Sequence, residues 1–546
     1  MRVRHGNPEA GYTMIMTMLA ATVMMTLAVV AVTAVRGDTN LQLYDLNRKQ
    51  AYEAAQAGIE DYAFHLKVDS SYWEKCTNVT KPSAVNQQGS TTNKRPVPGK
   101  TGAEYAIELV PAENQTTSPA YTACNTSNPQ ASMLEASGSL VGSFRIRSTG
   151  FFGKSKVSLV ATFKRPSFLD YVYFTQFETS DPIIYADDDW LSNAYKQCEK
   201  TIQQGRYSSS ISGSSGEYCN VISFINSEEI DGPLHTNDAF VACGSPIFGR
   251  TAADSIEVSA SSPGWYWGAS RSLGSARLSS NNCASANPVF KGTFKTNSPT
   301  LEPPATNGEL ATIAESKFKY TGQVKICLSG TNMTVGKNGT CTGVYSGAIP
   351  ANGVVYVANG TGCSTAYTPF TATYPATSGC GNAYVSGSYS GALTIAAEND
   401  IVIPADLTRS GNGLLGLIAN NFVRVFHNYP SQTASTCHPS GDGKTDAEDD
   451  AAEEYVKDME IDAAMLAINH SFIVDHYNCG RSLGTLTIEG AIAQKFRGPV
   501  GTFSSWGVGT GYSKNYEYDD RLRYVEPPNF LDPVTKSWVI GRETQG

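Results

Sequence analysis

Residues 9–35 read EAGYTMIMTMLAATVMMTLAVVAVTAV, and no charged residue occurs between Tyr12 and Val35. As a helix this stretch is about 36 Å long at 1.5 Å per residue, which is enough to cross a bilayer. Arg2, Arg4 and His5 precede it. By the positive-inside rule these residues keep the N-terminus in the cytoplasm, so the chain beyond the stretch lies outside. The sequence therefore predicts a single membrane helix close to the N-terminus.

The composition of the remainder favours strands over helices. The 546-residue chain has 41% hydrophobic and 17% charged residues, with 50 Gly and 28 Tyr. This balance is typical of many short strands joined by turns, so a mostly β fold is expected. The net charge of -9 and the absence of a basic run argue against a nucleic-acid partner.

All the cysteines follow the apolar stretch, and none shows the CxxC spacing of a zinc site. An even number of single cysteines is typical of an oxidising compartment, where disulfides form. Neighbours in the sequence suggest local pairs, namely Cys198 with Cys219, Cys327 with Cys341, and Cys363 with Cys380. The complete set of disulfide candidates is Cys76, Cys124, Cys198, Cys219, Cys243, Cys283, Cys327, Cys341, Cys363, Cys380, Cys437 and Cys479.

The start of the chain resembles a type IV prepilin signal. A short basic leader ends in Gly11, and Tyr12 and Thr13 then open the uncharged helix. The resemblance implies that a membrane peptidase cuts after Gly11 and methylates the new N-terminal residue, Tyr12. It also implies that the helix first anchors the subunit in the membrane and later packs in the core of a filament.

One position departs from the prepilin pattern. Major subunits of the family usually carry Glu five residues after the cut, where its carboxylate pairs with a neighbour's N-terminal amine, but this chain has Met16. Some minor pilins and pseudopilins that initiate or cap filaments also lack this Glu. The resemblance therefore implies a minor or tip subunit, and the length of the chain agrees with this interpretation.

The helix is expected to continue past the membrane. In residues 41–66, apolar side chains recur at helical spacing, and the segment Ala51 to Glu60 also looks like the helix extension of minor pilins. A plain membrane anchor with an amphipathic stalk would show the same periodicity. The expected apolar face consists of Tyr44, Ala51, Ala55, Ile59, Tyr62 and Leu66, with Arg48, Lys49, Gln56 and Glu60 lying between its members.

Four segments are predicted. Residues 1–11 form the leader, residues 12–35 the transmembrane or filament-core helix, and residues 36–167 the helix extension with a small antiparallel sheet. That sheet includes a strand at 103–112 and a hairpin at 143–167 that turns in FFGKSK. Residues 168–546 form a large extracellular, disulfide-stapled β-domain.

Short apolar runs separated by turn residues fill the large domain, for example 228–249, 391–407, 413–426 and 484–503. Such runs can stack into a β-solenoid, although no strict repeat period is visible, and an irregular β-sandwich is the alternative. The block from Gly391 onward also resembles segments of long pilin-associated proteins of bacteria, particularly actinobacteria. That resemblance carries no known activity.

Few residues suggest chemistry. The strongest enzymatic or metal-binding candidates are Asp187, Asp188 and Asp189 in YADDDW, but they lack the spacing of a calcium loop. We expect His235, Asn237 and Asp238 to form a turn, and His470 and His476 to be solvated loop residues, since neither group has metal or triad spacing. No catalytic residue, metal or cofactor is predicted, and the chain is not expected to be an enzyme. The acidic stretch 446–462 is expected to be a solvated loop or short helix.

These features together predict a minor or tip subunit of a type IV pilus or related filament. Its expected partners are other pilin subunits, the assembly machinery, the membrane and a surface ligand of the β-domain, with adhesion as a role. Its expected location is the bacterial cytoplasmic membrane, with the N-terminus inside, and then the cell surface or pilus. The alternatives are a membrane-anchored surface enzyme acting on polysaccharide and a surface protein that forms no filament.

Overall fold

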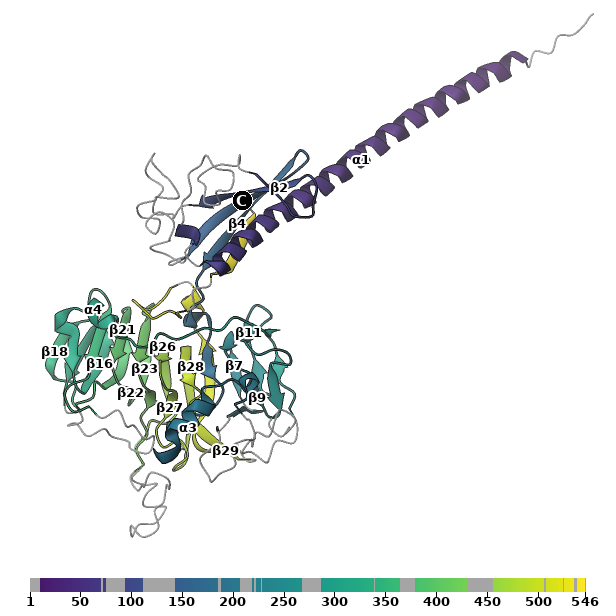
Figure 1. Cartoon of the computed structure of the whole chain (residues 1–546). Coiled ribbons are helices and arrows are strands. Elements are labelled where there is room, and N and C mark those ends of the chain that lie inside the picture. Colours follow the sequence, from purple (N-terminus) through teal and green to yellow (C-terminus); the bar gives the residue numbers. More distant parts are fainter. Residues whose placement is uncertain are drawn as a thin grey trace, which may run out of the picture. The chain divides into compact units, whose positions relative to one another are not determined.

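The chain divides into two compact units (Figure 1). Unit 1 comprises Met1–Arg165 and Lys536–Gly546, and unit 2 comprises Pro166–Thr535. The computed structural model describes residues 10–69, 72–74, 94–110, 143–184, 188–206, 219, 222–226, 228–267, 286–337, 339–363, 379–429, 455–504, 507–523, 525–534 and 538–545.

Unit 1 consists of one long helix and an antiparallel sheet. Helix α1 (Ala10–Val68) is continuous, so the predicted membrane helix and its extension are a single element. The sheet has the order β1-β2-β3-β4-β31. Its strands are β1 (Arg95–Pro96), β2 (Ala103–Val110), β3 (Phe144–Phe152), β4 (Ser155–Lys164) and β31 (Val539–Gln545).

The predicted hairpin at 143–167 is confirmed. Strands β3 and β4 pair antiparallel, and their ladder closes at Phe152 opposite Ser155. Gly153, in the turn, has a φ of 58°, a left-handed conformation that glycine adopts without steric cost. The small antiparallel sheet therefore forms where the alternating pattern and the turn residues place it.

The predicted segment 168–546 needs correction at its C-terminal end. Strand β31 belongs to unit 1, where it pairs antiparallel with β4. Unit 2 is thus inserted between two neighbouring strands of the first sheet. The sequence contains no local signal for this pairing, because the partner strand lies far away along the chain.

Unit 2 is built mostly from parallel strand pairs. The antiparallel pairs in its large sheet are β16 with β17, β17 with β18, and β29 with β30. Its first part contains α3 (Asp188–Cys198), β5 (Tyr173–Phe177), β6 (Ser223–Phe224), β7 (Glu229–Asp231), β8 (Leu234–Thr236), β9 (Phe240–Ala242), β10 (Ile247–Phe248), β11 (Ser255–Val258), β12 (Trp265–Trp267), β13 (Val289–Phe290) and β14 (Thr293–Lys295).

The second part of unit 2 runs from residue 310 to η7 (Asp520–Arg523). It contains α4 (Leu310–Ile313), β15 (Lys319–Thr321), β16 (Val324–Gly330), β17 (Asn332–Gly336), β18 (Gly343–Ala348), β19 (Val354–Ala358), β20 (Ala383–Tyr389), β21 (Leu393–Ala397), β22 (Ile401–Ile403), β23 (Leu407–Arg409), β24 (Leu415–Ala419), β25 (Val423–Val425), β26 (Glu460–Ala467), β27 (Phe472–Val474), β28 (Ser482–Phe496), β29 (Gly501–Ser504) and β30 (Gly507–Tyr518).

One column of side chains follows these parallel ladders from strand to strand. Each member pairs in register with the next, and all but Phe294, which is partly buried, lie in the core. The members, in spatial order, are Val355, Ile395, Leu417, Met465, Ile492, Tyr173, Leu234, Ile256 and Phe294. Both faces of the central strands are buried, which explains the near-continuous apolar runs of the sequence.

The order of this column shows how the chain runs through unit 2. The first strand of the unit, β5, lies beside β28, one of its last strands. From β5 the chain proceeds through β8 and β11 to β14 at one end, and then reaches β15 by way of residues 296–318. It returns through β19, β21, β24 and β26 to β28. The first and last strands of the unit thus meet inside the stack.

The connecting segment 296–318 is held against the strands that it passes. Asn237 donates to the carbonyl of Leu301 at 2.7 Å and accepts from its amide at 2.8 Å. Asn307 donates to the carbonyls of Ala397 at 2.8 Å and Ile418 at 3.0 Å. These bonds satisfy buried carbonyls of the stack and fix the path of the connection.

Candidate assembly helix and its attachment

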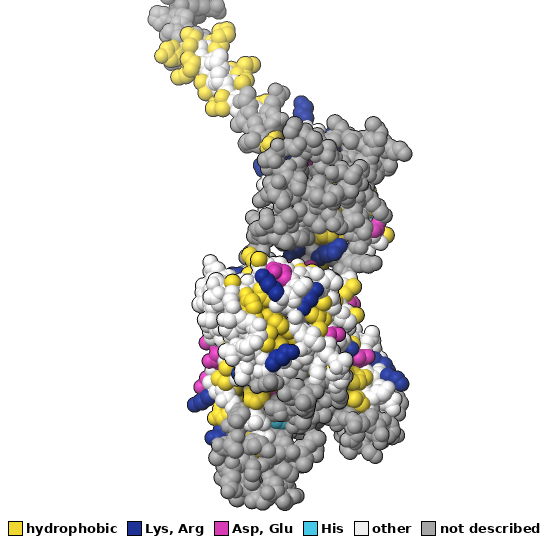
Figure 2. Space-filling model, turned by 90° about the vertical axis from the view of Figure 1, so that its left-hand side faces the viewer, with side chains coloured by type: hydrophobic (Ala, Val, Ile, Leu, Met, Phe, Trp, Pro, Cys, Tyr) yellow, Lys and Arg dark blue, Asp and Glu magenta, His cyan; other side chains and the backbone are white. Residues whose placement is uncertain are grey.

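The N-terminal half of α1 is the clearest candidate functional surface. Residues Tyr12–Val32 form a span with a mean hydropathy of 2.3, and none of this span is buried within the chain. Figure 2 shows apolar side chains on the visible face of this part of the helix. A helix that is apolar all round and covers nothing of its own chain is suited to a bilayer or to packing against other helices.

Threonine hydroxyls within the span bond to their own helix. Thr17 donates to the carbonyl of Met14 at 3.0 Å, Thr22 to that of Leu19 at 2.9 Å, and Thr26 to that of Val23 at 2.8 Å. These bonds satisfy the hydroxyls without water. The span therefore presents an apolar exterior in spite of its threonines.

The predicted processing site lies at the beginning of α1. Gly11 and Tyr12 are helical, and the side chains of Tyr12 and Met16 are 73% and 64% exposed. Thr13 lies on the same first turns of the helix. Cleavage after Gly11 and methylation of Tyr12 stay predictions.

The predicted apolar face of the helix extension is confirmed in part. Ala51, Ala55, Ile59, Tyr62 and Leu66 are fully buried and belong to the core of unit 1. Tyr44, the first member of the predicted face, is 59% exposed and lies outside that core. The apolar period continues through Tyr44, but the core contacts begin only at Ala51.

Small residues bring α1 into close contact with the sheet. A Cβ atom built on Gly150 of β3 would lie 2.0 Å from the carbonyl oxygen of Ala51 and 2.3 Å from the amide nitrogen of Ala55. A Cβ atom on Gly58 would lie 2.3 Å from the hydroxyl of Ser148. The alanines and glycines of AYEAAQAGIE thus allow the helix backbone to touch β3 directly, which sequence reasoning did not predict.

An aromatic cluster closes the core at the C-terminal end of α1. The ring of Phe144 lies 5.3 Å from Phe163, 5.5 Å from Trp73 and 4.7 Å from Trp538. Tyr62 reaches the same cluster, with its ring 5.6 Å from that of Phe163. Since Trp538 directly precedes β31, the C-terminal segment supplies part of the core around α1.

Ionisable groups surround this core. Arg95 lies 3.3 Å from the carboxylate of Asp61, and the ring of His65 stacks on Tyr72 at 4.7 Å. Burial raises the pKa of Tyr105 to about 12. These tyrosines are therefore neutral at physiological pH and act as packing groups.

Unit 2 leaves unit 1 at a defined end of the sheet. The β3–β4 turn lies beside Asn47 of α1. A Cβ atom built on Gly153, in this turn, would lie 3.4 Å from the Asn47 side chain. The other end of β4 carries Phe163, beside Tyr62. The insertion therefore departs from the end of the sheet next to the C-terminal end of α1, and the apolar span lies beyond the opposite end.

The predicted local disulfides are confirmed. Cys198 bonds to Cys219, Cys327 to Cys341, and Cys363 to Cys380. Cys243 and Cys479 are also oxidised to disulfides. Among the described cysteines none is a free thiol, in agreement with an oxidising compartment. The remaining candidates, Cys76, Cys124, Cys283 and Cys437, lie outside the described residues.

The side chains of the predicted acidic candidates lie outside the part of the chain that the structure describes. Asp188 and Asp189 begin helix α3, and Asp187 lies outside the described residues. Within the part of the chain that the structure describes, no group of three or more His, Cys, Asp or Glu side chains is placed to hold a metal ion. Most of the acidic stretch 446–462 also lies outside the described residues.

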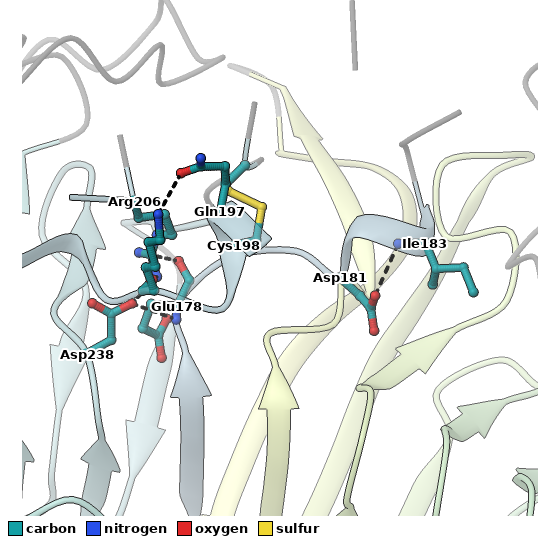
Figure 3. Close-up of a disulfide and its surroundings, with 9 residues drawn as sticks. Glu178, Asp181, Ile183, Gln197, Cys198, Arg206 and Asp238 are labelled. Atoms are coloured by element: carbon teal, nitrogen blue, oxygen red, sulfur yellow. Dashed lines mark hydrogen bonds and ion pairs between the residues drawn. A yellow bond between two sulfur atoms is a disulfide. The ribbon is translucent and has the colours of Figure 1, made fainter. Parts of the chain in front are cut away.

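The histidine-containing segments serve the fold. His235 is buried, with Nδ1 3.4 Å from Glu257 and Nε2 3.2 Å from Asn237. Asp238 is buried, pairs with Arg206, and accepts from the amide of Glu178 at 3.1 Å (Figure 3). The predicted turn at 235–238 is thus a buried polar cluster at the end of β8.

The prediction of solvated loop histidines was wrong for His476. Its side chain is buried, and its Nδ1 lies 2.8 Å from the carbonyl of His427. His470 is partly exposed and lies 2.7 Å from Asp181, which also accepts from Tyr195 at 2.8 Å. Figure 3 shows Asp181 beside Ile183, whose amide donates to it at 3.1 Å. The two histidines bond to different groups and form no shared site.

Comparison with solved structures gives a likeness to a pilin. No protein-family model matches the chain, and no curated protein matches its sequence. A solved structure of the competence-associated pilin ComZ from Thermus thermophilus aligns with a TM-score of 0.26 and 10% identity. The alignment covers 92% of this chain and 97% of that one.

Proposed function

We propose that the chain is a minor or tip subunit of a type IV pilus or a related filament. The observation that carries this proposal is the insertion of unit 2 into the sheet that packs on α1. The insertion leaves the apolar span and the helix–sheet core continuous. One part of the chain can therefore assemble through α1 while another, much larger part is displayed.

Hydrophobic packing would drive the assembly step. None of the Tyr12–Val32 span is buried within the chain, so its apolar surface needs either lipid or neighbouring helices. We infer that the span first anchors the subunit in the bacterial cytoplasmic membrane and then packs in the filament core. Its partners would be other pilin subunits and the assembly machinery.

The presence of Met16 favours a specialised position of the subunit in the filament over a position that repeats along the shaft. A thioether cannot form the ion pair that a Glu carboxylate makes with the N-terminal amine of a neighbouring major subunit. The size of unit 2 supports the same view, because a domain of this length would be hard to place at every step of a thin fibre. These two features support a location at the tip or another specialised site.

Unit 2 would be the displayed part, and we infer that it is an irregular β-solenoid. The parallel ladders and the continuous buried column support this inference, since each coil would cover the apolar row of the next. Unequal spacing of the column members along the chain explains why the sequence shows no strict period. A rigid stack with many surface loops would suit adhesion to a surface ligand.

The decisive experiment is mass analysis of the N-terminal peptide of the protein from its native membrane. We expect a mature chain that begins at methylated Tyr12. A chain that still begins at Met1 would overturn the proposal and would favour the surface protein that uses α1 only as an anchor. For the tip location, immunogold labelling of unit 2 should mark filament ends, and labelling along the whole shaft would contradict it.

A further inference from the structure

The place where the first and last strands of unit 2 meet contains a buried lysine and a buried glutamate. Strand β30 pairs parallel with β7, with Tyr516 opposite Ile230 and Glu517 opposite Asp231. The same register places Lys514, two residues before Tyr516, opposite Glu228, two residues before Ile230. The Nζ of Lys514 forms an ion pair with Oε1 of Glu228.

Both partners are removed from solvent. The side chains of Lys514 and Glu228 are 7% and 3% exposed. Burial, together with the nearby charge of Arg497, lowers the pKa of the Lys514 amine, against the opposing effect of Glu228. A buried amine with a lowered pKa has more of the neutral, nucleophilic form than a surface lysine has.

Arg497 contacts both carboxylates of this cluster. Its guanidinium lies 3.6 Å from Oε2 of Glu228 and 3.4 Å from Oε2 of Glu178. Its Nη2 is buried and makes no hydrogen bond among the described residues. Because Nη2 is the guanidinium atom that lies 3.6 Å from Oε2 of Glu228, it is placed to stabilise negative charge that develops on that carboxyl group.

Glu178 provides a second, fully buried carboxyl group. Burial raises its pKa, although Arg497 and a hydrogen bond from Thr175 oppose the shift. The ring of Phe224 lies under the guanidinium of Arg497 at 3.6 Å, and the buried rings of Tyr173 and Tyr516 belong to the surrounding core. The cluster therefore combines an amine, two carboxyl groups and a cation in an apolar enclosure.

We propose that Lys514 and Glu228 form an intramolecular amide bond between Nζ and Cδ when unit 2 folds. The register holds the two groups opposite each other, and their burial excludes bulk water. Arg497 would stabilise the developing negative charge, and Glu178 would transfer a proton. The bond would link β30 to the segment before β7 and would close the junction between the two ends of the unit.

The reaction needs no external reagent. The ammonium proton of Lys514 passes to the Glu228 carboxylate, which leaves a neutral amine and a neutral carboxyl group. The Nζ lone pair attacks Cδ, and Arg497 stabilises the oxyanion of the tetrahedral intermediate. Glu178 moves a proton from nitrogen to the departing hydroxyl, and the C–O bond breaks with release of one water.

Such a bond would hold a junction that the described disulfides do not hold. The three disulfides with both partners described join residues 21, 14 and 17 positions apart, so each closes a local loop. The junction of β30 and β7 joins segments that are separated by most of unit 2. The inference rests on this geometry and does not depend on the proposed pilus function.

The test is mass spectrometry of the full chain, purified in detergent, reduced and alkylated. We expect an intact mass lower by one water, about 18 Da, than the mass calculated for the alkylated chain with the N-terminus that the same sample shows. Trypsin should leave Lys514 uncleaved and yield the peptides 207–250 and 498–521 joined as one species. An unshifted mass with both peptides recovered separately, and normal cleavage at Lys514, would overturn the proposal.

The chain supplies its own control pair. Lys495 lies 2.7 Å from Glu199, but these side chains are 23% and 41% exposed. Their peptides should be recovered unlinked, because water competes at the surface and no second carboxyl group assists. Linkage of this pair at a similar level would show non-specific condensation and would overturn the assignment of a dedicated site.

Two variants separate the amide bond from a simple ion pair. Lys514→Arg keeps the positive charge but has no amine that can condense, so the mass deficit should disappear. Glu178→Gln keeps both reacting groups, and we expect at least a tenfold loss in the linked fraction. Full linkage in Glu178→Gln would refute the proton-transfer role. Intact local disulfides in a parallel digest without reduction would show that the variant has folded.

Discussion

Lys164, the last residue of β4, pairs with Val539, the first residue of β31, so the two points where the chain enters and leaves unit 2 lie opposite each other in one antiparallel ladder. Insertions are tolerated where the two chain ends lie close together, because the host sheet then keeps its geometry. It follows that the sheet of unit 1 is completed only by the last residues of the chain. Trp538 lies in the core of unit 1, so this core also needs the last residues of the chain.

We therefore predict that Trp538→Ala destabilises unit 1 by about 3–5 kcal/mol, as other large-to-small changes in aromatic cores do. The loss should appear as faster hydrogen exchange in β2, β3 and β4 of the full chain in detergent. Trp265→Ala, at a partly buried position of β12 in unit 2, is the matched control and should leave these strands protected. Unchanged exchange of β4 in Trp538→Ala would contradict a role of the C-terminal segment in the core.

The elements that could be predicted from the sequence depend on local signals. The apolar span, the helical period from Ala51 to Leu66 and the β3–β4 hairpin each lie within a short stretch of chain. The confirmed disulfides are also local, because short loops bring neighbouring cysteines together without help from the fold. Local periodicity and turn chemistry were sufficient for these predictions.

The pairings between distant segments could not be predicted. Nothing in residues 536–546 identifies β4 as the partner of β31, and nothing near Tyr173 identifies Ile492 as its neighbour. Tyr44 is a further example. Its spacing places it on the apolar face of the helix, but the core of unit 1 begins only at Ala51 and leaves Tyr44 exposed. The buried charges of unit 2 were also missed, because acidic and basic residues ordinarily indicate a surface.

A second prediction concerns the contact between helix and sheet. Gly150→Val should force α1 away from β3, because a Cβ atom there would overlap the backbone of Ala51 and Ala55. Overpacking of this kind costs about 1–3 kcal/mol, and more where backbone atoms must move. The measurement is pulse proteolysis in urea, following the segment 94–110.

The control for this prediction is Gly99→Asn. Gly99 has a φ of 76° and no atom within 4 Å of a Cβ position, and Asn adopts this left-handed conformation better than most residues. Its urea midpoint should stay close to that of the parent. Equal stability of Gly150→Val and Gly99→Asn would show that the close approach at Gly150 is unimportant.

A third prediction concerns acid stability. Burial alone would raise the pKa of Glu257, but hydrogen bonds with His235, Ser255 and Tyr171 outweigh it and hold the pKa well below its usual value. The folded pKa is thus lower than the unfolded pKa of about 4.3. This carboxylate therefore contributes stability that is complete above the unfolded pKa and is lost as the pH falls through it toward the folded value.

Glu257→Gln should accordingly flatten the decline in stability below about pH 5. The check is the urea midpoint of unit 2 as a function of pH. Ser255→Ala removes one of the four side-chain partners, which are Tyr171, His235, Ser255 and Lys295, and should flatten the decline by a smaller amount. If Glu257→Gln loses stability with the same slope as the parent, the carboxylate does not control acid unfolding.

The last prediction concerns the buried Arg424. It lies at the centre of β25, with its Nε and Nη2 3.0 and 2.8 Å from the two carboxylate oxygens of Asp475 and its Nη1 3.4 Å from Asp400. All three side chains are fully buried. Arg424→Ala leaves two carboxylates in the core without this cation, and we expect a loss of about 3–5 kcal/mol in the free energy of unfolding.

Arg424→Lys and Lys495→Ala separate the possible reasons for this loss. Lys495→Ala removes the partly exposed pair with Glu199, which should cost less than about 1 kcal/mol. Arg424→Lys keeps the charge but cannot donate to both oxygens of Asp475 in one plane, so its stability should lie between that of Arg424→Ala and the parent. If Arg424→Lys were as stable as the parent, charge alone would hold Asp400 and Asp475 to β25, and the paired hydrogen bonds would add nothing.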